Sequence, residues 1–402
     1  MRVAHFFSGN PSSGAASGAL NLCNGLLKEG IEISIYNNQF DFSVRDNKFY
    51  YNENFIKKIY SFKNNILDRI AISGLQDKIK FSSGIIGNFP IEKNELNNYD
   101  LIHLHWINNG FINLDSLKNI HIPIVWTIRD MWPLTGGCHY SLGCKKYYKE
   151  CSSCPNLKSF NPFKDQIKKI FNIKRDILSN LKLNLVPISK WLENEINQSK
   201  ILKDQSVTQI YNCVDNDIFY PSNYLKDRNE LNLPKDKFII LVGSQKLNDK
   251  IKNNKEILNL VNKFNKDYYF VSFGKFFDNF SNIRNFGFIK NKEILRKLYS
   301  SANVYLSFAK EEAFGKTLVE SLMCNTPIIS NDNISAREII KHKYNGYLVK
   351  NNNYHDAIIW INKNINKNIK KFNSDNLNKF SVKQISKEYI SLYKNILNEK
   401  KK

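Results

Sequence analysis

Short apolar runs alternate with amphipathic segments along the chain, and this alternation begins twice. Its first cycle, within residues 2–37, consists of the apolar run RVAHFF, the turn SGNPSSGAASG, the helical segment ALNLCNGLLKEG and the apolar run IEISIYN. A strand, turn, helix and strand in this order favour a parallel sheet with helices on its faces. The order starts again at KFIILVGSQ, residues 237–245. The sequence therefore predicts an α/β fold with two Rossmann-like, doubly wound domains that face a cleft.

The chain of 402 residues is too long for one ordinary core, and a polar stretch with Pro234 separates the two cycles. We therefore predict a first domain over residues 1–220, a linker over 221–235, a second domain over 236–384 and a C-terminal helix over 385–402. That helix is amphipathic and either packs back on the first domain or caps the second one. Ligands are expected at the carboxyl ends of the strands, between the domains.

The charge of the chain limits its partners. Lys and Arg number 59 against 37 Asp and Glu, a formal net charge of +22. Such a surface attracts polyanions or anionic lipid headgroups. Alternatively, the excess reflects a composition rich in Asn, Ile and Lys throughout. Because motifs that read bases are absent from the sequence, we predict no nucleic-acid partner, and a zinc-bearing nucleic-acid binder is only a remote alternative.

The location of the protein is predicted from its apolar segments. The sequence has no apolar run of about 18 residues, so no transmembrane helix is expected. Its start, MRVAHFFSGN, lacks the long apolar core of a signal peptide. We therefore predict a cytoplasmic protein, with peripheral contact at the inner face of the anionic membrane as an option.

The stretch EEAFGKTLVE, residues 311–320, allows two interpretations. Thr317 followed three residues later by Glu320 is typical of a capping box, in which the carboxylate only satisfies backbone N–H groups. Alternatively, the N-terminus of the helix binds a phosphate group, and Gly315 lets the backbone approach that group. Glu312 and Glu320 would then hold the hydroxyl groups of a nucleotide sugar on either side of the phosphate.

Over nearly its whole length the chain resembles the retaining glycosyltransferases of family 4, which have the GT-B fold. EEAFGKTLVE resembles their E-x7-E motif, IYNCVDNDIFYP their IPNGVDxxxF turn, and AREIIKHKYNGYLV their closing segment. The stretch from NFGFIK at 285 to PIIS at 330 follows the family in order and spacing. VWTIRDMWPLTGGCHYSLGCKKYYKECSSCP, residues 125–155, is similar to a subgroup that includes colanic-acid, exopolysaccharide and O-antigen transferases.

The resemblance implies a retaining, metal-independent hexosyltransferase. It would move a sugar from a UDP- or GDP-sugar to a lipid-linked or polysaccharide acceptor in cell-surface glycan biosynthesis. The alternative is a catalytically inactive protein of the same fold that binds nucleotide sugars or glycans. Neither the residues nor the resemblance names the sugar, the base, the acceptor or the oligomeric state.

The resemblance also implies roles for individual residues. Glu320 would bind the donor ribose, Glu312 would face the donor sugar, and the backbone at Gly287 would read the base. Catalytic roles are expected for Glu312, Arg129 and His105. The predicted donor-binding residues are Gly14, Ala15, Lys252, Gly287, Phe288, Ile289, Phe314, Gly315, Lys316, Thr317 and Glu320.

The sequence departs from the family at two places. Arg129 stands where many members carry a histidine that touches the donor sugar; its high pKa excludes acid–base catalysis, but it can anchor a phosphate or carboxylate. His105, at a strand end, is either a contact of the site or a packed structural histidine. Ser244 stands where an arginine of the phosphate clamp is common, and Lys252 is the expected replacement.

Four cysteines, Cys138, Cys144, Cys151 and Cys154, fall within 17 residues. Four thiolates at this spacing, with a C-x2-C knuckle, could close a tetrahedral zinc site, and His139 is a spare ligand. Such a zinc would be structural, because four thiolates leave no open position. The alternative is a set of free thiols on a family loop.

Overall fold

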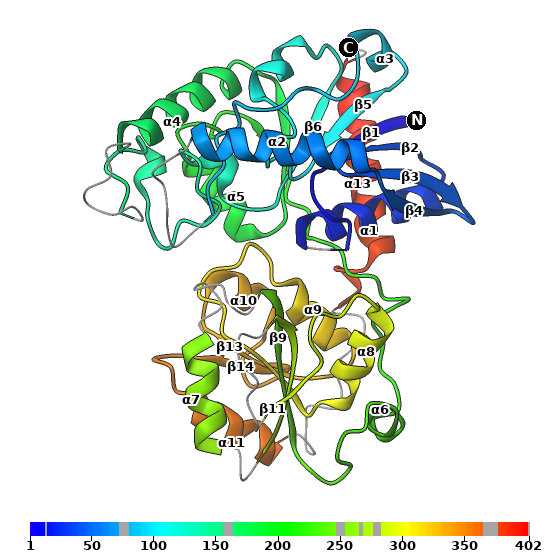
Figure 1. The fold of residues 1–402 in the computed structure, drawn as a ribbon, viewed down its shortest axis with the longest axis vertical. Helices are drawn as coiled ribbons and strands as arrows, with labels where there is room; N and C mark the ends of the chain where they lie inside the picture. The colour runs from blue at the N-terminus through cyan, green and yellow to red at the C-terminus, as the bar shows by residue number, and fades with distance from the viewer. Residues whose placement is uncertain are drawn as a thin grey trace. The chain divides into compact units, whose positions relative to one another are not determined.

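The computed structural model describes residues 1–12, 14–71, 80–155, 164–246, 254–264, 268–275, 283–364 and 377–400. The chain forms two compact units (Figure 1). The first consists of Met1–Tyr211 with Ile385–Lys402, and the second of Asn212–Gln384. Each contains a six-stranded sheet in which all described pairings are parallel. The prediction of an α/β fold with two Rossmann-like domains is confirmed.

The sheet of the first unit has the strand order β2-β1-β5-β6-β7-β8. Its strands are β1 (Arg2–Phe6), β2 (Glu32–Tyr36), β5 (Leu101–Leu104), β6 (Ile124–Ile128), β7 (Leu183–Pro187) and β8 (Ser206–Val207). Val3, in β1, pairs with Ile33 on one side and Leu101 on the other. Because β1 is covered on both faces, Val3 and Phe6 are both fully buried, which explains the unbroken apolar run in the sequence.

Helices and one hairpin surround this sheet. The hairpin comprises β3 (Phe40–Arg45) and β4 (Lys48–Glu53). The helices are α1 (Gly14–Lys28), α2 (Phe55–Ala71), α3 (Lys93–Leu96), α4 (Lys164–Leu178) and α5 (Lys190–Gln198), with 3-10 turns η1 (Leu114–Asn119), η2 (Trp132–Leu134) and η3 (Lys146–Tyr148). None of the helices that the structure describes combines the length and the apolar composition needed to cross a bilayer.

The C-terminal helix α13 (Val382–Lys400) completes the first unit, and Figure 1 shows it beside the first sheet. Two of its tyrosines bind side chains of the sheet. The Tyr393 hydroxyl lies 2.6 Å from Nδ1 of His103, and the Tyr389 hydroxyl lies 2.8 Å from Oγ1 of Thr127. Since all four side chains are buried, these bonds fix the helix on the sheet.

The sheet of the second unit has the strand order β11-β10-β9-β12-β13-β14. Its strands are β9 (Ile239–Lys246), β10 (Tyr269–Lys275), β11 (Ile283–Asn285), β12 (Val304–Ser307), β13 (Ile328–Asn331) and β14 (Gly346–Val349). Counted from β9, this is the 3-2-1-4-5-6 order of the doubly wound fold. The direction of winding reverses between β9 and β12, so a ligand site is expected at the carboxyl ends of these two strands.

Six helices of the second unit are described: α6 (Tyr224–Glu230), α7 (Asn254–Phe264), α8 (Lys292–Ser301), α9 (Lys316–Met323), α10 (Ile334–Ile339) and α11 (Tyr354–Asn364). The first of them, α6, occupies the predicted linker, residues 221–235. Arg228 of α6 is 2% exposed and donates to the carbonyl groups of Ser301 and Lys237 at 2.9 and 3.0 Å. These bonds tie the segment to the second unit.

Candidate active site

The loop after β12 leads into α9, at the edge of the sheet where the winding reverses. Gly315 is the N-cap of α9 and has a φ of +89°, in the left-handed region that favours glycine. Its carbonyl oxygen accepts the first helical bond, from Leu318 N at 2.9 Å. The amides of Lys316 and Thr317 come before that bond and lie at the positive end of the helix dipole.

The capping-box interpretation of Thr317 and Glu320 is wrong. The helix begins one residue earlier than Thr317, and no side chain caps it. The Glu320 carboxylate, 3% exposed, lies instead 3.4 Å from the Lys316 ammonium group and accepts a bond from the Tyr299 hydroxyl at 3.3 Å. A carboxylate that is buried beside a cation is placed for ligand binding or for a structural ion pair, but not for capping.

Tyr305 lies close to both glutamates of the motif, Glu312 and Glu320. Its hydroxyl donates to the carbonyl of Gly243, at 2.6 Å, near the carboxyl end of β9. Burial raises the pKa of Tyr305, and the negative charges of Glu312 and Glu320 raise it further. Both carboxylates therefore lie close enough to act on one phenol, at the point where the strands β9 and β12 diverge.

The remaining predicted donor-binding residues of the second unit occupy two places. Gly287, with a φ of +63°, lies in the loop after β11, and its carbonyl accepts from Gly274 N at 2.6 Å. The following Phe288 is 40% exposed, and Ile289 is partly buried. Phe314 is buried and packs against Phe380, with ring centroids 5.5 Å apart. Lys252 lies outside the described residues.

An open hollow of about 480 Å³ lies beyond the ends of β13 and β14. It is lined by Lys310, Asn331, Asp332, Asn333, Arg337, Val349, Lys350, Asn351 and Asn352. Asp332 and Arg337 form a bidentate ion pair there, at 2.6 and 3.0 Å. None of the predicted site residues lines this hollow, so the sequence motifs do not point to it.

In the first unit, the predicted site residues follow β1, β5 and β6. Gly14, with a φ of +43°, begins α1, is exposed, and has open space where a Cβ would lie. Ala15 follows it in the first turn. His105 and Arg129 come directly after β5 and β6 and are 2% and 8% exposed. All four lie at the carboxyl edge of the sheet, as the parallel order of the strands requires.

Arg129 and His105 belong to a buried chain of hydrogen bonds that continues to His5. Nη2 of Arg129 lies 3.3 Å from Nδ1 of His105, and Nε2 of His105 lies 3.0 Å from Nδ1 of His5. A guanidinium group can only donate, so Nδ1 of His105 accepts and its Nε2–H donates to His5. The sequence analysis missed His5, whose only signal was a histidine in the middle of an apolar strand.

All three buried histidines of this region are neutral. Burial and, to a lesser extent, the positive charge of Arg129 lower the pKa of His5 to about 3. Burial also lowers the pKa of His103 and of His105. Within the described residues, the ring nitrogens of His5, His103 and His105 form a group within 4.8 Å that could hold a metal ion.

Two observations argue against a cation in this group. His103 already uses both nitrogens, since Nδ1 bonds Tyr393 and Nε2 bonds Thr127 at 2.7 Å. The Arg129 guanidinium also lies beside His105, and like charges repel in a buried site. His103 is therefore a structural histidine that connects the sheet to α13.

The segment after Arg129 is held by a buried carboxylate. Asp130 accepts from Trp106 Nε1 at 2.8 Å and pairs with Nδ1 of His139 at 2.6 Å. The other nitrogen of His139, Nε2, lies 3.0 Å from the Ser82 hydroxyl. Since both of its ring nitrogens have partners, His139 is not the spare metal ligand that its position in the sequence indicated.

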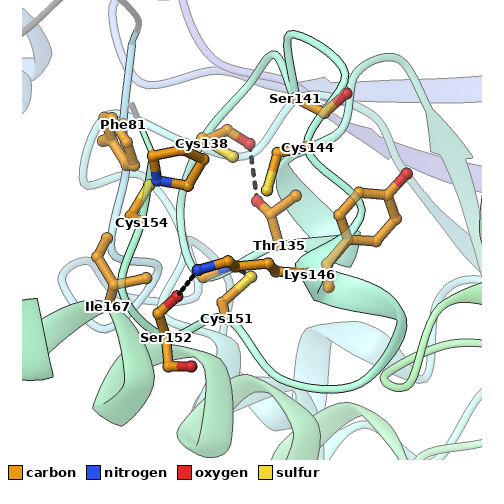
Figure 2. Close-up of a pocket in the computed structure, with 13 residues that line it drawn as sticks. Phe81, Thr135, Cys138, Ser141, Cys144, Lys146, Cys151, Ser152, Cys154 and Ile167 are labelled. Carbon is orange, nitrogen blue, oxygen red and sulfur yellow. Dashed lines mark hydrogen bonds between the residues drawn. The ribbon is translucent and has the colours of Figure 1, made fainter. Parts of the chain in front are cut away.

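Figure 2 shows where the structure places the four clustered cysteines. Cys138, Cys144, Cys151 and Cys154 line one small cavity of about 20 Å³. All four are free thiols and are partly buried. The structure therefore brings the four cysteines together around one cavity.

Most of the second unit is similar to a known protein family. Residues 224–376 match the family described as Glycosyl transferases group 1. The match covers most of the second unit. The matched residues include both glutamates of the candidate site, the loop at Gly287 and the whole of α9, so the geometry described above lies within the segment that is similar to this family.

Two curated proteins are similar to this chain. One, from Escherichia coli K12, is named as a colanic acid biosynthesis glycosyl transferase, WcaC. It is 23% identical over 316 residues, which are 74% of this chain and 76% of WcaC. The other, the uncharacterized glycosyltransferase MJ1607 of Methanocaldococcus jannaschii, is 34% identical over 118 residues, which are 27% of this chain and 29% of MJ1607.

Solved structures share the fold of the whole chain. Sucrose-phosphate synthase from Thermosynechococcus elongatus is 16% identical, with a TM-score of 0.68 and 99% of each chain covered. HepE from Anabaena, in complex with UDP and glucose, is 13% identical, with a TM-score of 0.59, 97% of this chain and 98% of that chain covered. These likenesses confirm the GT-B fold beyond the residues that match the family model.

Proposed function

We propose that the protein is a retaining glycosyltransferase. It moves a hexosyl group from a UDP- or GDP-sugar to a lipid-linked or polysaccharide acceptor in cell-surface glycan biosynthesis. The observation that carries the proposal is the position of Glu312 and Glu320 around the N-terminus of α9, at the edge where β9 and β12 diverge. HepE was solved with UDP and glucose, and WcaC is named for colanic acid biosynthesis, which supports this choice of donor and pathway class.

The proposed mechanism depends on stabilising the leaving group. In glycosyl transfer the transition state resembles an oxocarbenium ion, and negative charge grows on the departing phosphate. The N–H groups of Lys316 and Thr317 would donate to that phosphate, and a preorganised dipole in a site without water is an effective stabiliser. On this proposal no metal ion is required for the transfer.

The two glutamates would have different roles. Glu320 would accept hydrogen bonds from the ribose diol of the donor, because a buried carboxylate can accept two of them. Lys316, which pairs with Glu320 at 3.4 Å in the structure, would then be released to contact the diphosphate. Glu312, which is half-buried on the loop, would contact the donor sugar.

The test has two stages. A thermal-shift panel of UDP- and GDP-sugars identifies the donor, since a ligand at 100 times its Kd adds about 2.7 kcal/mol of stability. Transfer from the labelled donor to a lipid-linked acceptor is then measured in the presence and absence of EDTA. Retention of activity in EDTA and retention of anomeric configuration are expected. Donor binding with neither transfer nor hydrolysis would instead favour an inactive protein that binds nucleotide sugars.

A further inference from the structure

The four clustered cysteines surround a cavity that has a positive charge buried next to it. Lys174 of α4 is fully buried, and its Nζ donates to the carbonyl groups of Trp132 and Thr135, the latter at 2.8 Å. No ion pair between Lys174 and a carboxylate is found among the residues that the structure describes. Cys138 and Cys151 lie close enough to Lys174 to act on its charge, and the carboxylates of Asp130 and Asp68 act on it more weakly.

A buried ammonium group without a carboxylate is costly unless another anion lies nearby. Zn²⁺ with four thiolates carries a net charge of −2 and would supply that anion. Two further contacts fit a thiolate site. Gly136 N donates to Sγ of Cys151 at 3.3 Å, and the Lys146 ammonium group holds the loop between the C-x2-C cysteines by bonds to the carbonyl groups of Ser152 and Ser153, at 3.1 and 2.7 Å.

We propose that Cys138, Cys144, Cys151 and Cys154 bind one structural Zn²⁺, with Lys174 as the compensating charge. The cavity of about 20 Å³ between them can hold one small ion (Figure 2). In the described part of the chain, no three of the four sulfur atoms lie within 4.8 Å of one another, so the ion would draw the loop inwards. This site is separate from the proposed transfer reaction, and its presence does not depend on that activity.

The metal content of the purified chain tests this proposal. About one zinc per chain is expected by mass spectrometry. Protein produced with cobalt should show thiolate-to-cobalt charge transfer and the intense visible bands of a tetrahedral ion. Cys144→Ser should lose the metal, whereas Cys213→Ala, at a buried cysteine outside the cluster, should keep it. A chain that is purified without zinc and gives no tetrahedral cobalt spectrum would overturn the site, even if Cys144→Ser fails to fold.

Lys174→Met separates the charge argument from packing, because methionine keeps most of the volume of the side chain. A change beside a metal's ligands typically weakens its binding by about 10-fold to 100-fold. Competition with a coloured chelator measures this loss. Equal zinc retention in Lys174→Met and in the unaltered chain would show that Lys174 does not contribute to zinc binding.

Helix α2 carries a second, independent feature, because its apolar side faces solvent. Its exposed apolar side chains, with exposed fractions between 41% and 74%, are Phe55, Ile56, Ile59, Tyr60, Phe62, Ile66, Leu67 and Ile70. A helix on a protein surface normally presents this side to the core. An exposed apolar patch of this kind marks an interaction surface.

Hydrogen bonds hold α2 in this orientation. Ser61 and Asp68 are 5% and 3% exposed on the side that faces the protein. The Ser61 hydroxyl accepts from Asn38 at 2.9 Å, and the Asp68 carboxylate accepts from Ser83 N at 2.9 Å. Asn64 donates to the carbonyl of Gly110 at 3.0 Å. These hydrogen bonds attach the polar side of α2 to the protein, so its apolar side faces outwards.

The charges on the outward side are positive. Lys63 and Arg69 are exposed, Lys58 pairs with Glu53 at 2.8 Å, and the only acid of the helix, Asp68, is buried. Lys63 lies between Ile59 and Ile66 in the middle of the apolar side, as residues four and three apart do on a helix. A protein partner would have to bury this ammonium group, but at a bilayer surface it can extend to the lipid phosphates.

We infer that α2 docks on an anionic phospholipid bilayer, with its apolar side chains between the headgroups. The inference depends on the fold alone and holds whether or not the chain transfers sugar. Basic residues near such a surface are attracted to its negative charge. The same docking would bring a lipid-linked acceptor to the first unit.

Co-sedimentation with vesicles of phosphatidylcholine, with and without phosphatidylglycerol, tests the docking surface. The chain should bind the anionic vesicles, and Ile59→Glu with Ile66→Glu should weaken binding by about 10-fold or more. Ile294→Glu with Tyr344→Glu, at exposed apolar residues of the second unit, is the matched control and should bind as the unaltered chain does. No binding to anionic vesicles, or self-association that the α2 changes abolish, would overturn the inference.

Discussion

The Glu320 carboxylate lies 3.4 Å from the Lys316 ammonium group, one helical turn earlier in α9. Glu320 is 3% exposed, and its other described partner is the Tyr299 hydroxyl. The acid that the motif assigns to the donor ribose is therefore held by a cation of the same helix. Binding of the donor would exchange one charge-assisted contact for another, which keeps the carboxylate from being buried without a partner.

The first prediction concerns the two glutamates of this motif. Glu320→Gln should weaken donor binding by about 10-fold to 100-fold, because hydrogen bonds to a charged group contribute about 1.5–3 kcal/mol. Glu312→Gln should mainly lower kcat. Glu293→Gln, at an exposed residue of α8, is the control. Donor titration and initial rates of transfer measure both effects, and equal, small changes in the two variants would contradict the assigned roles.

Gly315→Ala should destabilise the second unit. An alanine at a φ of +89° costs about 1–2 kcal/mol, and its Cβ would lie 2.9 Å from Cδ1 of Leu318. Gly287→Ala is the matched comparison, because Gly287 also has a positive φ but open space around its Cβ position. Urea unfolding of the two variants should show the larger loss for Gly315→Ala. A larger loss for Gly287→Ala would mean that the contact with Leu318 does not matter.

The buried histidines predict that acid destabilises the first unit. His5 has a pKa of about 3 in the folded chain, against about 6.5 when unfolded. Between these values the unfolded chain binds more protons, so stability falls as the pH falls, by about 1.4 kcal/mol per pH unit for each such histidine. Above about pH 6.5 this contribution is constant.

Urea unfolding at several pH values between about 7.5 and about 5.5 measures this slope. His5→Gln should make the slope shallower, since glutamine does not titrate. His121→Gln, at an exposed histidine, should leave it unchanged. A slope that is the same in all three proteins would show that His5 is not buried in its neutral form.

Tyr393→Phe should loosen the C-terminal helix. The change leaves Nδ1 of the buried His103 without its partner at 2.6 Å, and an unsatisfied buried polar group costs about 1–3 kcal/mol. Hydrogen exchange of the α13 amides and thermal unfolding should both report the loss. Tyr50→Phe, at a residue that is 46% exposed, should change neither.

The pattern of the sequence predicted the parts of the fold that depend on local order. The succession of strand, helix and strand predicts parallel sheets, and a motif that follows a strand must lie at the carboxyl edge of its sheet. This rule correctly predicts that Glu312 and Gly315 lie in the loop after β12, at the carboxyl edge of the second sheet. His5 could not be found in this way, because only the pairing of β1 with β5 brings it to His103 and His105.

Contacts between side chains were the harder part. Thr317 and Glu320 have the spacing of a capping box, but Gly315 is the N-cap, two residues before Thr317, and the Glu320 carboxylate pairs with Lys316. His139 lies next to a clustered cysteine in the sequence, but Asp130 and Ser82 occupy its nitrogens. In each case the side chain binds a different partner from the predicted one. The spacing of residues in the sequence is compatible with both partners and does not show which of them is bound.

The position of α13 has a consequence for synthesis. The first sheet is complete by residue 207, yet the helix whose tyrosines bind His103 and Thr127 is translated only after the second unit. The second unit can fold while the first unit is still incomplete. A chain that is released before residue 385 therefore lacks both tyrosines, and the side chains of His103 and Thr127 stay without these partners.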